Sequence, residues 1–118
     1  MDLQLKPISK DGIPEAISKA ELYRYLNEPG EAESICRDIL AADAENQAAL
    51  RLMGLSITDQ FTGNASDRYN EAENTFQNLT DPYQRSYYAG ILHDALRFLE
   101  DCHEALDVLG RSRLVANS

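Results

Sequence analysis

Apolar residues recur every three or four positions along most of this chain, the spacing that places side chains on one face of an α-helix. The first such stripe has Pro14 in its first turn, a position that suits proline, and consists of Ile13, Ile17, Ala20, Tyr23 and Leu26. Five further segments repeat the spacing. The pattern predicts six helices, over about residues 14–27, 30–42, 47–60, 67–80, 83–99 and 101–113.

Polar turns separate the predicted helices and pair them. Asn27-Glu28-Pro29-Gly30 ends the first helix, and Asp81-Pro82 ends the fourth. We expect Glu100-Asp101 to turn the chain between the fifth helix and the sixth. Helices joined by short turns pack as antiparallel hairpins, so six helices predict three hairpins. The expected organisation is a leader over residues 1–12, a helical domain over 13–113 and a tail over 114–118.

A repeated pair of residues supports this division. The second helix of each predicted hairpin opens on Glu-Ala, at Glu31-Ala32, Glu71-Ala72 and Glu104-Ala105. The alanines lie 40 and 33 residues apart, close to the period of helical-hairpin arrays. One hairpin cannot bury its apolar face alone, so hairpins stack and leave a concave surface that commonly holds another chain. The repetition therefore predicts partner binding as the class of function.

The middle repeat resembles the tetratricopeptide repeat, whose first helix carries W-x-x-L-G-x-x-Y and whose second carries A-x-x-x-F before a terminal proline. The matching residues are Leu50, Met53, Gly54, Ile57, Ala72, Phe76 and Pro82. The first repeat matches at Ala20, Tyr23, Ala32 and Cys36, and the third at Gly90, His93, Ala105 and Leu109. The resemblance covers residues 14–113 and implies an all-α fold of three antiparallel hairpins stacked as a short right-handed solenoid.

The resemblance also implies a binding face. Members of this family mostly act as adaptors or chaperones that hold a peptide or helix against the first helices of their hairpins. Carried over by position, the partner-binding residues are Ile17, Glu21, Arg24, Arg51, Leu52, Leu55, Tyr87, Tyr88 and Ile91. The subgroup that grips the carboxylate tail of heat-shock chaperones uses Lys, Asn and Arg, where this chain has Ile17, Glu21, Leu52, Gln84 and Tyr88. We therefore expect an amphipathic helix or extended apolar segment instead of a chaperone tail.

Three residue types carry structural expectations of their own. Glycine inside a helix costs about 1 kcal/mol relative to alanine, so Gly54 indicates close approach of a neighbouring helix. The adjacent Tyr87 and Tyr88 cannot both face one neighbour: one should pack between hairpins while the other faces the groove or solvent, or both are partly buried core residues. Cys36 and Cys102 form no C-x-x-C pair, and we expect both to be structural, Cys36 as a small buried hydrophobe.

Composition narrows the function further. Hydrophobic residues at 43% and charged residues at 26% of 118 indicate one small globular domain. A net charge of −9 argues against nucleic acid as a partner. No run of 18 apolar residues appears and the first residues lack the pattern of a signal peptide, so we expect no membrane partner and a cytoplasmic location.

The chain shows no motif for catalysis. His93, His103 and Cys102 are the residues that a metal site would need, but four converging ligands are not visible, and His93 is expected at a packing position. We therefore expect no metal, no cofactor, no catalytic residue and no enzymatic activity. Two functions follow: a non-catalytic interaction module that binds a peptide or helix, or an assembly subunit or small chaperone that forms a homodimer through its last hairpin, over residues 102–115.

Overall fold

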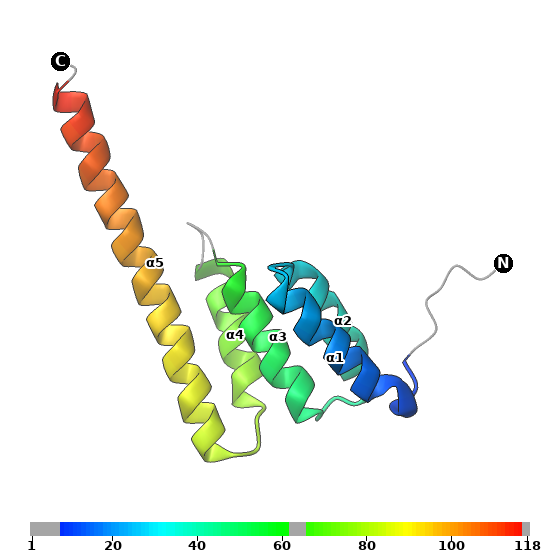
Figure 1. The fold of residues 1–118 in the computed structure, drawn as a ribbon. Helices are drawn as coiled ribbons and strands as arrows, with labels where there is room; N and C mark the ends of the chain where they lie inside the picture. The colour runs from blue at the N-terminus through cyan, green and yellow to red at the C-terminus, as the bar shows by residue number, and fades with distance from the viewer. Residues whose placement is uncertain (1–7, 62–65, 117–118) are drawn as a thin grey trace.

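The computed structural model describes residues 8–61 and 66–116, without the side chains of 66, 67, 103 and 105–116. The described residues form helices and no strand, which confirms the all-α prediction (Figure 1). A short 3-10 helix, η1 (Lys10–Gly12), precedes five α-helices: α1 (Ile13–Tyr25), α2 (Pro29–Ala42), α3 (Gln47–Asp59), α4 (Ser66–Gln77) and α5 (Pro82–Ala116).

The helices pack in chain order and form two layers. Each of α1 to α4 contacts the helix that follows it, and contacts also join α1 to α3 and α3 to α5. The odd-numbered helices therefore make one layer, and α2 and α4 lie behind it (Figure 1). This arrangement places residues of α1, α3 and α5 on a shared face although they lie far apart in sequence.

Local chemistry explains where the first helices end. Asn27 adopts a left-handed conformation with φ of 63°, in the turn that follows α1. The N–H of Glu28 donates to the carbonyl oxygen of Tyr23 at 2.8 Å, and the N–H of Asn27 donates to that of Arg24 at 3.0 Å. These two bonds form a Schellman C-cap, and Pro29 then opens α2 in the first-turn position that suits proline.

The predicted turn at Glu100-Asp101 and the separate sixth helix are wrong. The helix α5 continues without a break from Pro82 to Ala116, so one long helix occupies the place of the two predicted over residues 83–99 and 101–113. Residues 114–116, expected in the tail, belong to the same helix. The segment around residues 100 and 101 contains neither glycine nor proline, and polar residues alone do not end a helix. The C-terminal half of α5 extends beyond the other helices (Figure 1).

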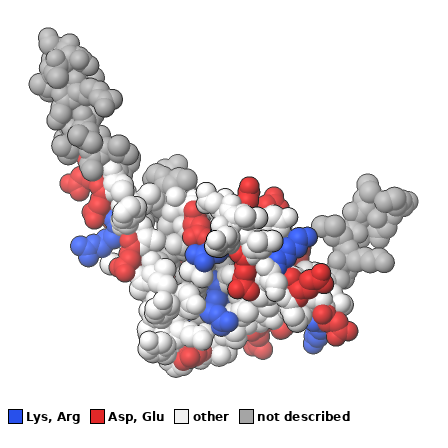
Figure 2. Space-filling view, viewed as in Figure 1, with Lys and Arg blue, Asp and Glu red and all other residues white. Residues whose placement is uncertain are grey.

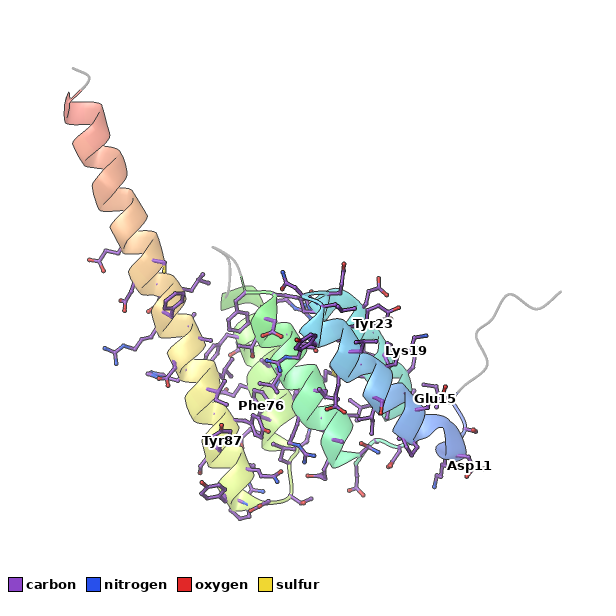
Figure 3. The ribbon with its side chains drawn as sticks, in the orientation of Figure 1. Asp11, Glu15, Lys19, Tyr23, Phe76 and Tyr87 are labelled. Atoms are coloured by element: carbon purple, nitrogen blue, oxygen red, sulfur yellow. The ribbon has the colours of Figure 1, made fainter. Side chains whose placement is uncertain are left out.

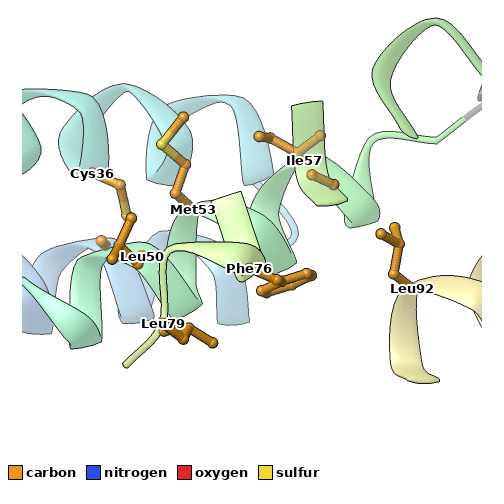
Figure 4. Packing of buried hydrophobic residues seen from close by; sticks show 9 residues of the cluster. Cys36, Leu50, Met53, Ile57, Phe76, Leu79 and Leu92 are labelled. Atoms are coloured by element: carbon orange, nitrogen blue, oxygen red, sulfur yellow. The ribbon is translucent and has the colours of Figure 1, made fainter. Parts of the chain in front are cut away.

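The main core lies among α1, α2, α3, α4 and the first half of α5. Its largest members include Cys36, Ile57, Phe76, Leu79 and Leu92, each less than 2% exposed (Figure 4). Burial confirms Cys36 as a small hydrophobe, and desolvation, with a smaller contribution from the Glu33 charge, raises the pKa of its thiol to about 12. Cys102 is half-buried within α5. A smaller cluster around Ile13, Ile39 and Ala49 also contacts Ile8 of the expected leader.

Gly54 lies against the ring of Phe76, which confirms the predicted close approach between helices. A Cβ atom at this glycine would come within 2.3, 2.5 and 2.8 Å of three ring carbons. The Phe76 ring also stacks on Tyr88, with ring centroids 5.2 Å apart. The glycine thus allows α4 to pack closely on α3. Through the stacked rings, Phe76 of α4 also contacts Tyr88 of α5.

A network of charged side chains joins α2 to α4, the two helices that lie behind the layer of odd-numbered helices. The buried carboxylate of Glu33 on α2 accepts hydrogen bonds from Arg37, from Gln60 and from Arg68 of α4, and Arg68 also pairs with Glu71. The hydrogen bonds from Arg68, Gln60 and Arg37 outweigh desolvation and lower the pKa of Glu33 to about 2. This network links the first hairpin to the second through groups that are satisfied within the protein.

Candidate partner-binding groove

Two adjoining hollows lie along the face of the α1, α3 and α5 layer. The first has a volume of about 250 Å³ and is lined by Glu21, Arg24, Ala48, Arg51, Leu52, Leu55 and Tyr88. The second, of about 530 Å³, shares Glu21, Arg24 and Leu52 with the first and adds Tyr25, Asn27 and Asp59. We refer to the two hollows together as the groove. Figure 2, in the same view as Figure 1, shows basic side chains in the middle of the molecule's visible face.

Most of the predicted binding face lines the groove. Six of its nine residues do so, namely Glu21, Arg24, Arg51, Leu52, Leu55 and Tyr88. The other three lie elsewhere: Ile17 packs half-buried against the cluster around Ile13, Tyr87 is 55% exposed, and Ile91 is half-buried on α5 outside the lining. The helix faces that the repeat spacing selected therefore converge in space.

The sequence analysis missed four lining residues: Ala48, Tyr25, Asn27 and Asp59. Helical spacing could have found three of them, because Tyr25 follows Glu21 by one turn, Asp59 follows Leu55 by one turn, and Ala48 precedes Leu52 by one turn. Asn27 has no such signal, since it enters the groove from the turn after α1.

Tyr88 forms the α5 wall of the groove, and the core holds it in place. Its ring stacks on Phe76 at an interplanar angle of 19°, and Tyr87 meets it edge-on at 85°. Figure 3 labels Phe76 and Tyr87 near the first turns of α5. Tyr88 is half-buried against the main core while Tyr87 is 55% exposed, which confirms that the adjacent tyrosines face different surroundings. Since the Phe76 ring also touches Gly54, the shape of this wall depends on the packing of α3 on α4.

The apolar lining of the groove is concentrated in the smaller hollow. Leu52 and Leu55 of α3 are half-buried and pack against the main core, so each offers part of its side chain to the hollow. Tyr25 lies at the α1 edge and is 87% exposed. Tyrosine is enriched on surfaces that bind proteins, where large amphipathic rings add contact area at a small cost in conformational entropy.

The two arginines of the groove differ in their partners: Arg24 pairs with a carboxylate, and Arg51 binds a neutral amide oxygen. The guanidinium of Arg24 forms a fork with the Asp59 carboxylate, with Nε 2.6 Å from Oδ2 and Nη2 3.3 Å from Oδ1. Both side chains are about one-third exposed, so the pair contributes less than about 1 kcal/mol to stability but holds α1 to the end of α3. Arg51 instead donates through Nη1 to the Gln84 oxygen at 3.3 Å.

Within the described residues, no carboxylate lies within 4 Å of the Arg51 guanidinium, and no basic group lies within 4 Å of Glu21. The lining thus holds two acidic and two basic side chains, of which one pair is joined. In a chain with a net charge of −9, this balance makes the groove less acidic than the molecule as a whole.

The described residues contain no group of three or more His, Cys, Asp or Glu side chains placed to hold a metal ion. The expected packing position of His93 is wrong, because its side chain is 63% exposed on α5; the His103 side chain lies outside the described residues. In the part of the chain that is described, no helix combines the length and apolar character required to cross a bilayer.

No protein-family model and no curated protein matches the sequence, and no solved structure matches the fold.

Proposed function

We propose that this protein is a non-catalytic interaction module of the tetratricopeptide type, which holds a helical or extended segment of another protein in the groove. The supporting observation is the convergence of α1, α3 and α5 on one hollow with an apolar floor, an aromatic wall and charged edges. We further propose that the two hairpins and the first half of α5 form a short right-handed solenoid. The order of contacts, with each odd helix touching the next odd helix, supports this arrangement.

The dimensions of the groove favour a peptide segment as its occupant. The two hollows, of about 250 and 530 Å³, adjoin along α1 and α3, which line both of them, and α5 contributes Tyr88 to the smaller one. An elongated ligand can therefore place successive side chains in both hollows. A helix achieves this with residues three or four positions apart, and an extended segment with alternate residues.

A selection experiment with a matched pair of tyrosine variants tests this proposal. Peptides 16 residues long and joined to phage through their C-termini are selected on the immobilised protein, and binding of the enriched peptides is measured by fluorescence anisotropy. Tyr25→Ala removes a ring that lines the groove, and Tyr83→Ala removes one outside the lining; the rings are 87% and 77% exposed, so neither change opens the core.

We expect Tyr25→Ala to weaken binding about tenfold or more, because aromatic residues are common hot spots at interfaces. Tyr83→Ala should bind like the wild type. Equal affinity for both variants, or the absence of any enriched peptide, would contradict binding in the groove.

A second function is supported by α5. This helix extends beyond the others, and Phe98 is 70% exposed on it (Figure 1). Leu92, Ala95, Leu99, Cys102, Leu106 and Leu109 follow one another at spacings of three and four, the heptad pattern of a seam between two helices. The pattern begins at Leu92, which is already buried against the main core. The alternative is thus an assembly subunit in which α5 pairs with α5 of a second copy.

Light scattering over a tenfold range of concentration distinguishes the two functions. A constant mass of two chains that Phe98→Glu reduces to one would support pairing through α5. A constant mass of one chain would contradict it and leave the groove as the site of interaction.

A further inference from the structure

Arg51 is a groove cation whose hydrogen-bonding capacity is largely unused. A guanidinium carries five N–H donors, and the described residues supply Arg51 with one acceptor, the neutral Gln84 oxygen at 3.3 Å. The neighbouring Arg24 differs, since Asp59 accepts from two of its nitrogens. The groove therefore contains one neutralised arginine and one that remains open to an anion.

This difference is notable in so acidic a chain. The sequence contains 20 acidic and 11 basic residues, yet no carboxylate of the described residues comes within 4 Å of Arg51. Arg51 is also half-buried, so part of its hydration is already lost. A partly dehydrated cation gains more from a charged acceptor than from a neutral one, and the planar guanidinium fits a carboxylate through two parallel hydrogen bonds.

The apolar surface next to Arg51 defines the rest of the ligand. Leu52, Leu55 and Tyr88 line the same hollow and offer a site for one aliphatic or aromatic side chain. Glu21 also lines it and has no basic partner within 4 Å in the described residues. Because like charges repel, Glu21 disfavours an acidic group at its own side of the hollow, so a single carboxylate should bind beside Arg51.

We infer that the segment bound in the groove carries an aspartate or glutamate side chain that pairs with Arg51, next to an apolar side chain that packs on Leu52, Leu55 and Tyr88. This inference rests on the proposed function, because it names the chemistry of the ligand for that same groove. The acceptor is a side chain within the segment. A free C-terminal carboxylate is not required.

The test compares each selected peptide with a version in which its acidic residues are replaced by Asn or Gln. Peptides selected while joined to phage through their C-termini have no free terminal carboxylate, and the synthetic peptides are amidated to keep this condition. Anisotropy then gives Kd for the wild type, for Arg51→Gln and for Arg97→Gln. Arg97 is an exposed arginine of α5 outside the lining, so it controls for the loss of one positive charge.

We expect the amide peptides to bind the wild type and Arg97→Gln at least tenfold more weakly than the acidic peptides. On Arg51→Gln the two versions should bind equally, because the group that distinguishes them is gone. Circular dichroism confirms that Arg51→Gln is folded, and Arg51→Lys should restore part of the difference between the two peptides.

The outcomes separate the inference from the function on which it rests. Peptides that lose affinity on Tyr25→Ala, yet bind equally as acids and as amides, would overturn the acidic ligand and leave the groove as a binding site. A preference for the acid that persists on Arg51→Gln would also overturn it. Failure to enrich any peptide that is sensitive to Tyr25→Ala would overturn both proposals together.

Discussion

Gly54→Ala adds one methyl group at the closest approach between α3 and α4. The new Cβ atom would lie 2.3 Å from the nearest carbon of the Phe76 ring, where carbon atoms in contact are normally about 3.5 Å apart or more. The ring is 1% exposed and stacked on Tyr88, so it cannot swing out to solvent. It must instead move by about 1 Å within a packed core, and Tyr88 must move with it.

The expected effect is the difference between two opposing contributions. Overpacking of a core costs about 1–3 kcal/mol, and a displaced, stacked ring places this site near the upper value. Alanine has a higher helix propensity than glycine, which returns about 1 kcal/mol. The free energy of unfolding should therefore fall by about 2 kcal/mol, or about 8 °C in Tm for a domain of this size.

Urea denaturation followed by circular dichroism measures this change, and Gly90→Ala is its matched control. Gly90 also lies inside a helix, but a Cβ atom there would have no neighbour within 4 Å. Gly90→Ala should therefore stabilise the protein by about 1 kcal/mol through helix propensity alone. If Gly54→Ala stabilised the protein as much as Gly90→Ala does, the close packing of α3 on the Phe76 ring would be refuted.

A double-mutant cycle identifies the ring as the cause. Phe76→Leu removes Cε1 and Cζ, the two ring carbons nearest to the new methyl group, so Gly54→Ala should be less destabilising in that background by about 1 kcal/mol or more. An unchanged penalty would mean that the cost arises from another neighbour.

Four further predictions follow from groups outside the groove floor. The Ser56 hydroxyl is buried without a hydrogen-bond partner among the described residues, so Ser56→Ala should raise the free energy of unfolding by up to about 1 kcal/mol in urea denaturation. Because the pKa of Glu33 falls from 4.5 to about 2 on folding, its ionised form stabilises the protein above pH 5; this stability should disappear as pH falls from 5 to 2, and Glu33→Gln should flatten the profile. Asn27 has φ of 63°, so Asn27→Ala should lower stability by about 1 kcal/mol, whereas Asn27→Gly should not. A colourimetric thiol reagent at pH 8 should modify half-buried Cys102 well before Cys36, which is fully buried with a pKa raised to about 12; equal rates would contradict this burial.

The sequence was most informative where local chemistry decides the structure. Helical periodicity located the first four helices to within a few residues, because an amphipathic helix has to turn its apolar stripe toward the core. The turn between α1 and α2 was equally clear, since Asn27 accepts the left-handed conformation and Pro29 starts the next helix. Gly54 was informative because its cost within a helix requires a compensating contact.

The end of the fifth helix was not decided by such local signals. Glu100 and Asp101 read as a turn only through analogy with the other repeats, and the chain there lacks the glycine or proline that would stop a helix. The structure continues α5 to Ala116, which removes the third hairpin and replaces it with one long helix. The Glu-Ala pair at Glu104-Ala105 therefore lies in a helix, as predicted, but that helix is α5 and not a separate sixth helix.

The groove was partly determined by the sequence and completed by the tertiary structure. The repeat resemblance named six residues of α1, α3 and α5 that line the groove and three, Ile17, Tyr87 and Ile91, that do not. Residues one turn apart share a face wherever the helix lies, so positions of this kind can be read from the sequence. Which charges meet depends instead on distances between helices: Asp59 is 35 residues from Arg24 yet binds it, and no described carboxylate reaches Arg51. Periodicity thus sets which side chains face inward, while only the packing of the helices decides which are neutralised and which remain open to a partner.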